Sequence, residues 1–167
     1  MAFPNGLSLL AAMSMLAASV VPGDRHGLPS GEYWRSHKIK IYTDKVETSP
    51  AFDTLCLATT AAGDMRFNLY IVANNLHTCE ADGIARWTGE LFEYRGSQAS
   101  DDPYCVLQIS RHGKQIVVED TRVEVNGESH YCREIYCGVR GVIGELHFDI
   151  SSRTRNARMT ADCKYPD

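Results

Sequence analysis

Six cysteines in a chain of 167 residues are the feature that most limits what this sequence can fold into. An even number of cysteines is typical of a protein that is cross-linked by disulfides in an oxidising compartment. Six cysteines allow fifteen pairings, and the sequence does not choose among them. As a working hypothesis we pair Cys56 with Cys163, Cys79 with Cys137, and Cys105 with Cys132. Each disulfide that closes a long loop stabilises a fold by about 3 to 5 kcal/mol.

The first residues predict export into such a compartment. Residues 1–21 contain no Lys, Arg, Asp or Glu, and residues 7–18 form an apolar run with the length of a secretory signal. Small side chains end this run, so we predict a signal peptide over 1–19 that is cleaved after Ser19. A membrane anchor or a buried helix is the alternative, but the run is shorter than the about 20 residues that span a bilayer. We therefore expect a periplasmic or secreted protein without a stable membrane span.

The rest of the chain predicts one domain with a short leader. Residues 22–35 are rich in Gly, Pro and Ser, a composition that does not sustain a helix or a strand. We therefore predict a flexible leader over 20–36 and a single disulfide-braced β domain over 37–167. The formal charge of −4 argues against a nucleic-acid partner, because affinity for phosphates needs a dense Lys and Arg footprint. Residues 151–158 are locally basic, which suits either an acidic partner or solubility alone.

Apolar and polar residues alternate with a period of two in several segments, which indicates strands with one buried face. This alternation is clearest over 65–71, and it recurs over 38–42, 105–109, 116–118 and 146–150. Sustained helical periodicity is absent outside the predicted signal peptide. We therefore predict a mostly β fold, a single antiparallel β-barrel or a strongly twisted β-sheet of about six to nine short strands.

Residues that favour turns lie between these segments. Residues 111–114 predict a hairpin with a four-residue loop, and Asn126-Gly127 is typical of a type I′ turn. Residues 74–79 predict a structured corner, because asparagine adopts left-handed backbone conformations. Residues 84–94, interrupted by Gly89, predict a bent or paired strand.

Two further segments are less distinctive. Ser49-Pro50 is compatible with the start of a short helix, whereas residues 54–60 have the composition of a strand, and we favour the strand. Residues 96–103 predict an exposed acidic loop without the ligand spacing of an EF-hand.

Metal binding is the alternative role for the cysteines. His77 and Cys79 stand two residues apart, as do His130 and Cys132, and Cys137 follows. This spacing is looser than that of a structural zinc site, and the sequence has no C-x-x-C. We therefore predict neither a metal site nor a cofactor.

Catalytic motifs are missing from the sequence. It contains no G-x-S-x-G, H-E-x-x-H or glycine-rich phosphate loop, and its six histidines are scattered. Acidic residues at 80 and 82, and at 90 and 93, more often form a solvated face than a catalytic pair. A small secreted hydrolase would use His77 or His130 as its general base, together with a nearby carboxylate.

Three short motifs carry a resemblance. They are N-x-H-x-C at 75–79, C-x-L-x-I at 105–109 and Y-C-G-x-R-G at 136–141. In this order, over about residues 66–148, the chain resembles a group of small, exported, functionally uncharacterised bacterial proteins. In size, export and disulfide-braced β structure it is more distantly similar to the lysozyme inhibitors of the bacterial envelope. Cys56 and Cys163 lie outside the pattern, which is one reason to pair them with each other.

Our leading hypothesis is an exported binding protein of the bacterial envelope, with inhibition of a cell-wall hydrolase such as lysozyme as its specific form. The contact residues that we predict are His77, Tyr136 and Arg140, since an inhibitor fills a cleft with preorganised loops. We favour a protein without enzymatic activity. The small secreted hydrolase and a purely structural envelope protein are the alternatives.

Overall fold

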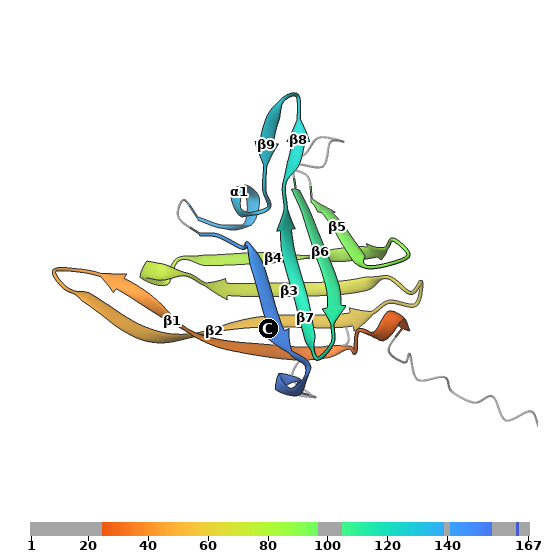
Figure 1. Cartoon of the computed structure of the whole chain (residues 1–167), viewed down its shortest axis with the longest axis horizontal. Coiled ribbons are helices and arrows are strands. Elements are labelled where there is room, and N and C mark those ends of the chain that lie inside the picture. The colour runs from red at the N-terminus through yellow and green to blue at the C-terminus, as the bar shows by residue number, and fades with distance from the viewer. Residues whose placement is uncertain (1–24, 97–104, 139–140, 155–162, 164–167) are drawn as a thin grey trace, which may run out of the picture.

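The computed structural model describes residues 25–96, 105–138, 141–154 and 163 (Figure 1). The predicted signal peptide with its cleavage site, most of the predicted acidic loop, Arg140 and the basic residues 155–158 lie outside the described residues. None of the helices in the described part of the chain is long and apolar enough to cross a membrane.

Eight antiparallel strands form one sheet in the order β1-β2-β3-β4-β5-β6-β7-β10. They are β1 (Gly31–Tyr42), β2 (Val46–Thr59), β3 (Met65–Val72), β4 (Thr78–Trp87), β5 (Phe92–Gly96), β6 (Cys105–His112), β7 (Gln115–Thr121) and β10 (Glu145–Asp149). The remaining elements are the hairpin of β8 (Val123–Val125) and β9 (Glu128–His130), the helix α1 (Arg133–Tyr136), and the 3₁₀ turns η1 (Arg25–Gly27), η2 (Asn74–Leu76) and η3 (Ile150–Ser152). The mostly β prediction is confirmed, as a nearly closed, barrel-like sheet.

The apolar residues of the alternating segments, which predicted the strands, also form the core. Met65, Phe67 and Leu69 of β3 are buried, while the residues between them are only half-buried, because successive side chains of a strand point to opposite faces. In Figure 1, β6 and β7 cross in front of β3 and β4, and buried residues of both pairs, such as Phe67 of β3 and Leu107 of β6, belong to one apolar cluster. Burial of each such side chain contributes about 1.5 to 3 kcal/mol.

The sheet is closed only in part. Its two edge strands, β1 and β10, lie next to each other without forming a ladder. At one end of this seam Glu32 and Thr154 form an antiparallel bridge. Beside the bridge, the backbone N–H of Trp34 donates to Ser152 Oγ at 3.1 Å. Individual contacts therefore replace a continuous ladder between the two edges.

The first strand begins earlier than predicted. β1 starts at Gly31, within the segment that was predicted to sustain neither helix nor strand, and this part of the prediction is wrong. Its register with β2 runs from the Gly31–Leu57 pair to the Tyr42–Val46 pair. Pairing with a partner strand therefore overrides the local Gly and Ser composition of 31–36.

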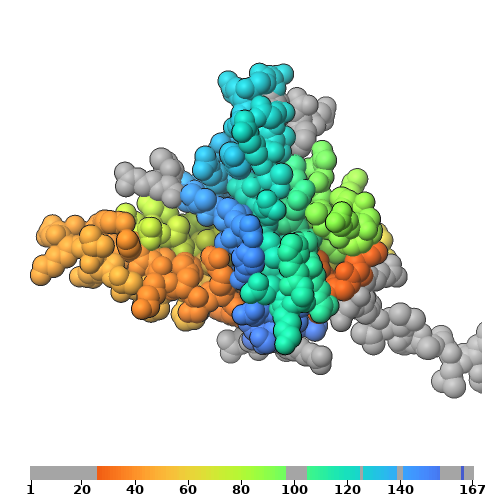
Figure 2. All heavy atoms as spheres, viewed as in Figure 1, coloured from red at the N-terminus to blue at the C-terminus, as the bar shows by residue number. Residues whose placement is uncertain are grey.

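The strand that we favoured over a helix at Ser49-Pro50 is confirmed, because β2 extends through Pro50. Two other local predictions need correction. The β6–β7 loop has two residues instead of four, because His112 pairs directly with Gln115. The described residues form ten strands instead of about six to nine, and β1 and β2 are long, with 12 and 14 residues. Only residues 54–59 of β2 pair with β3, so the tip of the β1–β2 hairpin projects, as does the β8–β9 hairpin (Figure 2).

Two predicted turns are confirmed. Asn126 and Gly127 both have positive φ, 52° and 82°, between the paired strands β8 and β9. Asn75 has φ 56° in the corner between β3 and β4. The paired-strand prediction on either side of Gly89 is also confirmed, since Trp87 of β4 pairs with Phe92 of β5.

The structure contains the three hypothesised disulfides. Cys56–Cys163 joins the middle of β2 to the C-terminal segment, and Cys105–Cys132 joins the start of β6 to the residue before α1. Cys79–Cys137 joins the start of β4 to the end of α1. All six thiols are used, so none of the His/Cys pairs offers a thiolate to a metal.

Replacing both Cys56 and Cys163 by serine should lower the free energy of unfolding by about 2 to 5 kcal/mol, because this disulfide closes the longest of the three loops. Urea unfolding monitored by circular dichroism measures the loss. The intact mass of the unmodified protein should be six hydrogens below that of its reduced form. Six alkylated thiols without prior reduction would contradict the three disulfides.

Candidate functional site

The corner between β3 and β4, residues 74–79, is the part of the predicted contact surface that the structure describes most fully. Its backbone turns tightly, since the N–H of Ala73 donates to the carbonyl of His77 at 2.7 Å. Both Asn75 and Leu76 adopt left-handed conformations, with φ 56° and 59°. The two adjacent asparagines in the sequence predicted the left-handed conformation of Asn75 but not that of Leu76.

Two side chains fasten this corner to the edge of β1. Asn74 Oδ1 accepts the backbone N–H of Lys40, and Asn75 Oδ1 accepts that of Tyr42, both at 2.7 Å. These N–H groups belong to the edge of β1 that does not face β2. The asparagines therefore satisfy donors that the open seam leaves unpaired, and they hold the corner at the same time.

Leu76 occupies an unfavourable position. Its side chain is 62% exposed, and a left-handed conformation costs a leucine about 1 to 2 kcal/mol. A bulky residue is rarely found in this conformation unless its surroundings impose it. Here the hydrogen bonds of Asn74 and Asn75 on one side and the disulfide of Cys79 on the other impose it.

The Cys79–Cys137 disulfide brings the two predicted contact segments together. Cys79 ends the corner, and Cys137 lies in the segment 136–141. The N–H of Gly141 donates to the carbonyl of Gly138 at 2.9 Å, which closes a tight turn against the disulfide. A Cβ atom at position 141 would lie 2.6 Å from Cys137 Cβ and 2.8 Å from Cys79 Sγ, so only glycine fits. Arg140 lies outside the described residues.

The other two predicted contact residues differ in their surroundings. The ring of His77 is half-buried and forms no hydrogen bond with the described residues. Tyr136 is also half-buried, but its hydroxyl is 2.5 Å from the hydroxyl of Tyr94. Burial, assisted by this hydrogen bond, raises the pKa of Tyr136 above its usual value. Tyr136 thus braces the turn with its hydroxyl, while the ring of His77 is available to a partner.

A cleft of about 370 Å³ lies beside the corner, at the open part of the seam. Its walls come from β1, from the end of β3 with Ala73 and Asn74, and from residues 142–146 before and within β10. Apolar side chains that include Ile39, Ile71 and Leu146 line its interior.

A charged cluster that the sequence analysis missed lies in the wall of this cleft. Arg35 Nε donates to Asp53 Oδ2 at 2.7 Å, and His37 Nδ1 is 3.4 Å from the same oxygen. The carboxylate of Asp53 is completely buried, and its other oxygen accepts the N–H of Val72 at 2.9 Å. His37 Nε2 lies 2.9 Å from the Val72 carbonyl oxygen. Arg35 and His37 share the inner face of β1 with the buried Tyr33 and Ile39, and this inward position of two basic residues was the signal that could have revealed the cluster.

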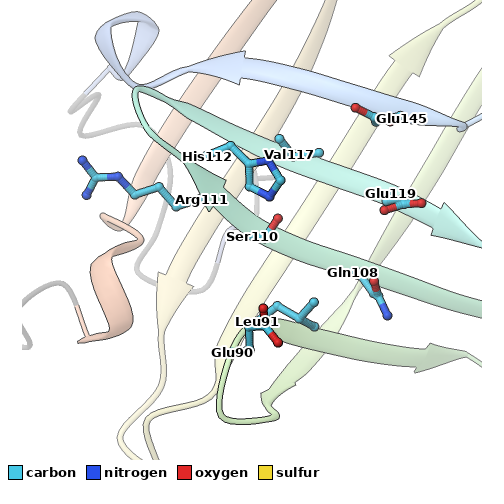
Figure 3. Close-up of a pocket in the computed structure, with 9 residues that line it drawn as sticks. All are labelled: Glu90, Leu91, Gln108, Ser110, Arg111, His112, Val117, Glu119 and Glu145. Carbon is cyan, nitrogen blue, oxygen red and sulfur yellow. The ribbon is translucent and has the colours of Figure 1, made fainter.

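A second hollow, of about 270 Å³, lies on the outer face of β6, β7 and β10 (Figure 3). Three glutamates line it, Glu90, Glu119 and Glu145, and the last two face each other across the β7–β10 pair. Arg111 also lines the hollow, but its guanidinium donates to the carbonyls of Gly27 and Gly113. Of the two acidic residues predicted to be solvated here, Glu90 is exposed, whereas Glu93 is half-buried and pairs with Arg95.

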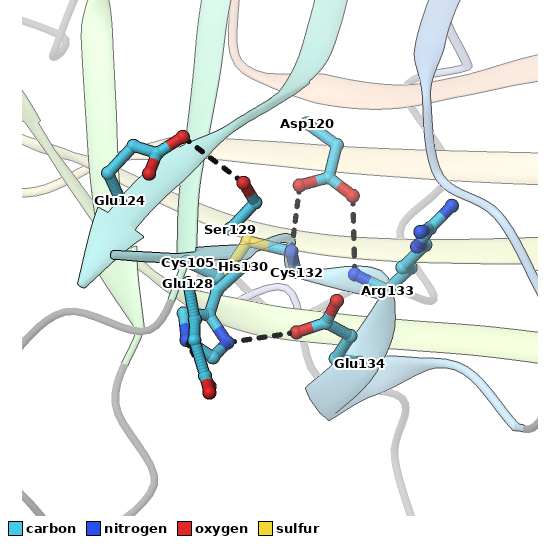
Figure 4. Close-up of polar contacts among 9 residues, drawn as sticks. All are labelled: Cys105, Asp120, Glu124, Glu128, Ser129, His130, Cys132, Arg133 and Glu134. Atoms are coloured by element: carbon cyan, nitrogen blue, oxygen red, sulfur yellow. Dashed lines mark hydrogen bonds and ion pairs between the residues drawn. A yellow bond between two sulfur atoms is a disulfide. The ribbon is translucent and has the colours of Figure 1, made fainter. Parts of the chain in front are cut away.

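The candidate bases of a hydrolase are separated from both of these hollows. His130 Nδ1 is 3.2 Å from Glu134 Oε2 and its Nε2 is 3.9 Å from Glu128 Oε2, at the base of the β8–β9 hairpin (Figure 4). Neither His130 nor His77 lines the cleft or the outer hollow. The His130–Glu134 pair therefore has the chemistry of a base and its orienting carboxylate, but it lies away from both of these hollows.

The base of this hairpin depends on a buried carboxylate. Asp120 accepts the backbone N–H groups of Cys132 at 2.8 Å and Arg133 at 3.2 Å, where α1 begins (Figure 4). Burial raises the pKa of the Asp120 carboxyl above its usual value, and the two N–H groups oppose this shift. The folded protein therefore holds a proton on Asp120 more tightly than the unfolded chain does.

Asp120→Asn tests this linkage. A carboxyl with a raised pKa in the folded state adds stability as pH falls from above its folded pKa towards 3.8, and that contribution is lost as pH rises again. We expect the free energy of unfolding of the unmodified protein, relative to Asp120→Asn, to increase as pH is lowered through this window. Urea titrations at several pH values measure the difference, and a difference independent of pH would contradict it.

No protein-family model matches this chain, and no curated protein or solved structure matches it either. The resemblance carried by the three motifs stays a prediction. A functional proposal therefore has to rest on the geometry of the corner and of its disulfide.

Proposed function

We propose that this protein is an exported binding protein of the bacterial envelope and that it inhibits a cell-wall hydrolase such as lysozyme. The proposed contact surface is the corner with Leu76 and His77, together with the turn of residues 136–141. The observation that carries the proposal is Leu76, an exposed apolar side chain held in a costly backbone conformation. Strain of this kind persists where function requires it and the surroundings supply the compensation.

The construction of the corner suits an inhibitor. A loop that is rigid before binding loses little conformational entropy when it enters a cleft, so more of the contact energy appears as affinity. Here the rigidity comes from the hydrogen bonds of Asn74 and Asn75 and from the Cys79–Cys137 disulfide. Leu76 offers an apolar anchor, and the unbonded ring of His77 adds a donor and an acceptor beside it.

The disulfides support the proposed location. Three disulfides that use every cysteine are typical of a protein that folds outside the reducing cytosol. The periplasm and the cell exterior both lie outside the reducing cytosol, and cell-wall hydrolases are found in both. A purely structural role would give no reason for an exposed, strained leucine at the apex of a braced corner.

Inhibition of lysozyme is the direct test. Lysis of bacterial cell walls is followed by turbidity with increasing amounts of the disulfide-bonded protein. We expect saturable inhibition near equimolar amounts, and His77→Ala should weaken it about tenfold, which corresponds to 1.4 kcal/mol. His147→Ala is the matched control, since His147 is exposed on β10 and pairs with Glu145 away from the corner. An unchanged rate of lysis at a large molar excess, with no complex in sedimentation experiments, would contradict the proposal.

Leu76→Asn separates stability from function. Asparagine tolerates the left-handed conformation, so we expect the free energy of unfolding to rise by about 0.5 to 1 kcal/mol. The same substitution removes the apolar anchor and should weaken inhibition about tenfold. Ile84→Asn, at an exposed apolar position on β4, is the control and should leave inhibition unchanged. A variant that is more stable and inhibits equally well would argue that the strain at Leu76 has no functional role.

A further inference from the structure

The unpaired edge of β1 has a periodic pattern of donors. The N–H groups of even-numbered residues point away from β2: Trp34 donates to Ser152, Lys40 to Asn74 and Tyr42 to Asn75. The register of β1 with β2 is continuous, so the N–H groups of Ser36 and Lys38 point in the same direction. These two have no acceptor among the described residues.

The two unpaired N–H groups lie at the cleft between β1 and β10. Lys38 itself lines this cleft, next to Arg35 and His37. Arg35 uses Nε and one terminal nitrogen for the buried carboxylate of Asp53. Its other terminal nitrogen, Nη1, has no partner among the described residues, and the side chain is partly exposed. Asp53 therefore fixes the guanidinium while leaving donors for a ligand.

The cleft is positive at one side and apolar within. Arg35 and Lys38 supply the charge, whereas Glu145, its one acidic lining residue, pairs with His147 on the outer face at 2.7 Å. Ile39, Ile71 and Leu146 are buried around the interior, and Val142, 55% exposed, stands on its rim. Its volume of about 370 Å³ lies within the usual range of small-molecule sites.

From these observations we infer that the cleft between β1 and β10 binds a carboxylate that carries an apolar group, as in an N-acylated apolar amino acid or the C-terminal residue of a peptide. The carboxylate is received by the free donors of Arg35, and the exposed Lys38 adds positive charge at the edge of the cleft. The apolar group packs against Val142 on the rim, over the buried side chains of Ile39 and Leu146, and the edge N–H groups of Ser36 and Lys38 face the amide of the ligand. This site adjoins the corner proposed to contact a hydrolase, since Asn74 belongs to both, but the residues that would bind the ligand are different from Leu76 and His77, so either proposal can fail alone.

Titration calorimetry of the full chain with simple probes tests the site. N-acetyl-leucine carries the carboxylate, the apolar group and the amide. N-acetyl-leucinamide lacks the negative charge, and acetate lacks the apolar group. We expect saturable binding of N-acetyl-leucine, with the amide and acetate each at least about tenfold weaker. An acetylated tetrapeptide ending in leucine distinguishes the sources, because tighter binding of the peptide identifies a peptide C-terminus and tighter binding of N-acetyl-leucine identifies a small metabolite.

Two variants localise the binding without disturbing the core. Val142→Asp places a negative charge on the exposed rim and should weaken N-acetyl-leucine about tenfold. Lys38→Ala should weaken it about threefold. Val46→Asp and Lys45→Ala are the matched controls, because both residues are exposed at the tip of the β1–β2 hairpin, and they should bind as the unmodified protein does.

Three results would overturn the inference. The first is the absence of saturable binding by N-acetyl-leucine and by the peptide at millimolar concentration. The second is equal affinity for the acid and the amide. The third is unchanged affinity in Val142→Asp, which would locate the binding elsewhere. Circular dichroism of each variant checks that a loss of affinity is not a loss of fold.

Discussion

The open edge of β1 is the constraint on which the rest of this structure depends. A strand in a closed barrel has partners on both sides, but β1 has β2 on one side and only individual acceptors on the other. Ser152 and Thr154 meet one end of that edge, and the corner at Asn74 and Asn75 meets the other. The asparagines accept N–H groups that β2 leaves unpaired, so the corner stabilises the edge of the sheet while the sheet orders the corner.

The proposed protein-contact surface and the cleft both follow from this arrangement. The asparagines that cap the edge also hold Leu76 outward. The N–H groups of Ser36 and Lys38 have no such acceptor, and at these residues the seam between β1 and β10 opens into the cleft. Asp53 orients the guanidinium of Arg35 in the wall of this cleft. Burying this carboxylate is tolerated because Arg35 and the N–H of Val72 compensate it.

Local patterns in the sequence predicted the structure where interactions between neighbouring residues determine the backbone conformation. The alternation over 65–71 predicted β3 because a half-buried strand needs that period, and Asn126-Gly127 predicted its turn because few residues accept positive φ. The strand at 31–36 was missed because its partner lies about 20 residues further along the chain. The Arg35–Asp53 pair was missed for the same reason, since the inward position of Arg35 becomes visible only once β1 is known to begin at Gly31 and to pair with β2. Leu76 was missed because its conformation is imposed by tertiary contacts.

The closure of the seam between β1 and β10 has a consequence for the order in which the chain acquires this fold. Glu32 of β1 pairs with Thr154, and Cys56 of the neighbouring β2 is bonded to Cys163, so segments far apart in the sequence meet at this side of the sheet. A chain that emerges N-terminus first presents β1 long before its C-terminal partners arrive. Until then the edge of β1 is open to pairing with other chains, as any exposed strand edge is. Early binding of the corner asparagines to Lys40 and Tyr42 would shield the far end of that edge before the C-terminal partners arrive.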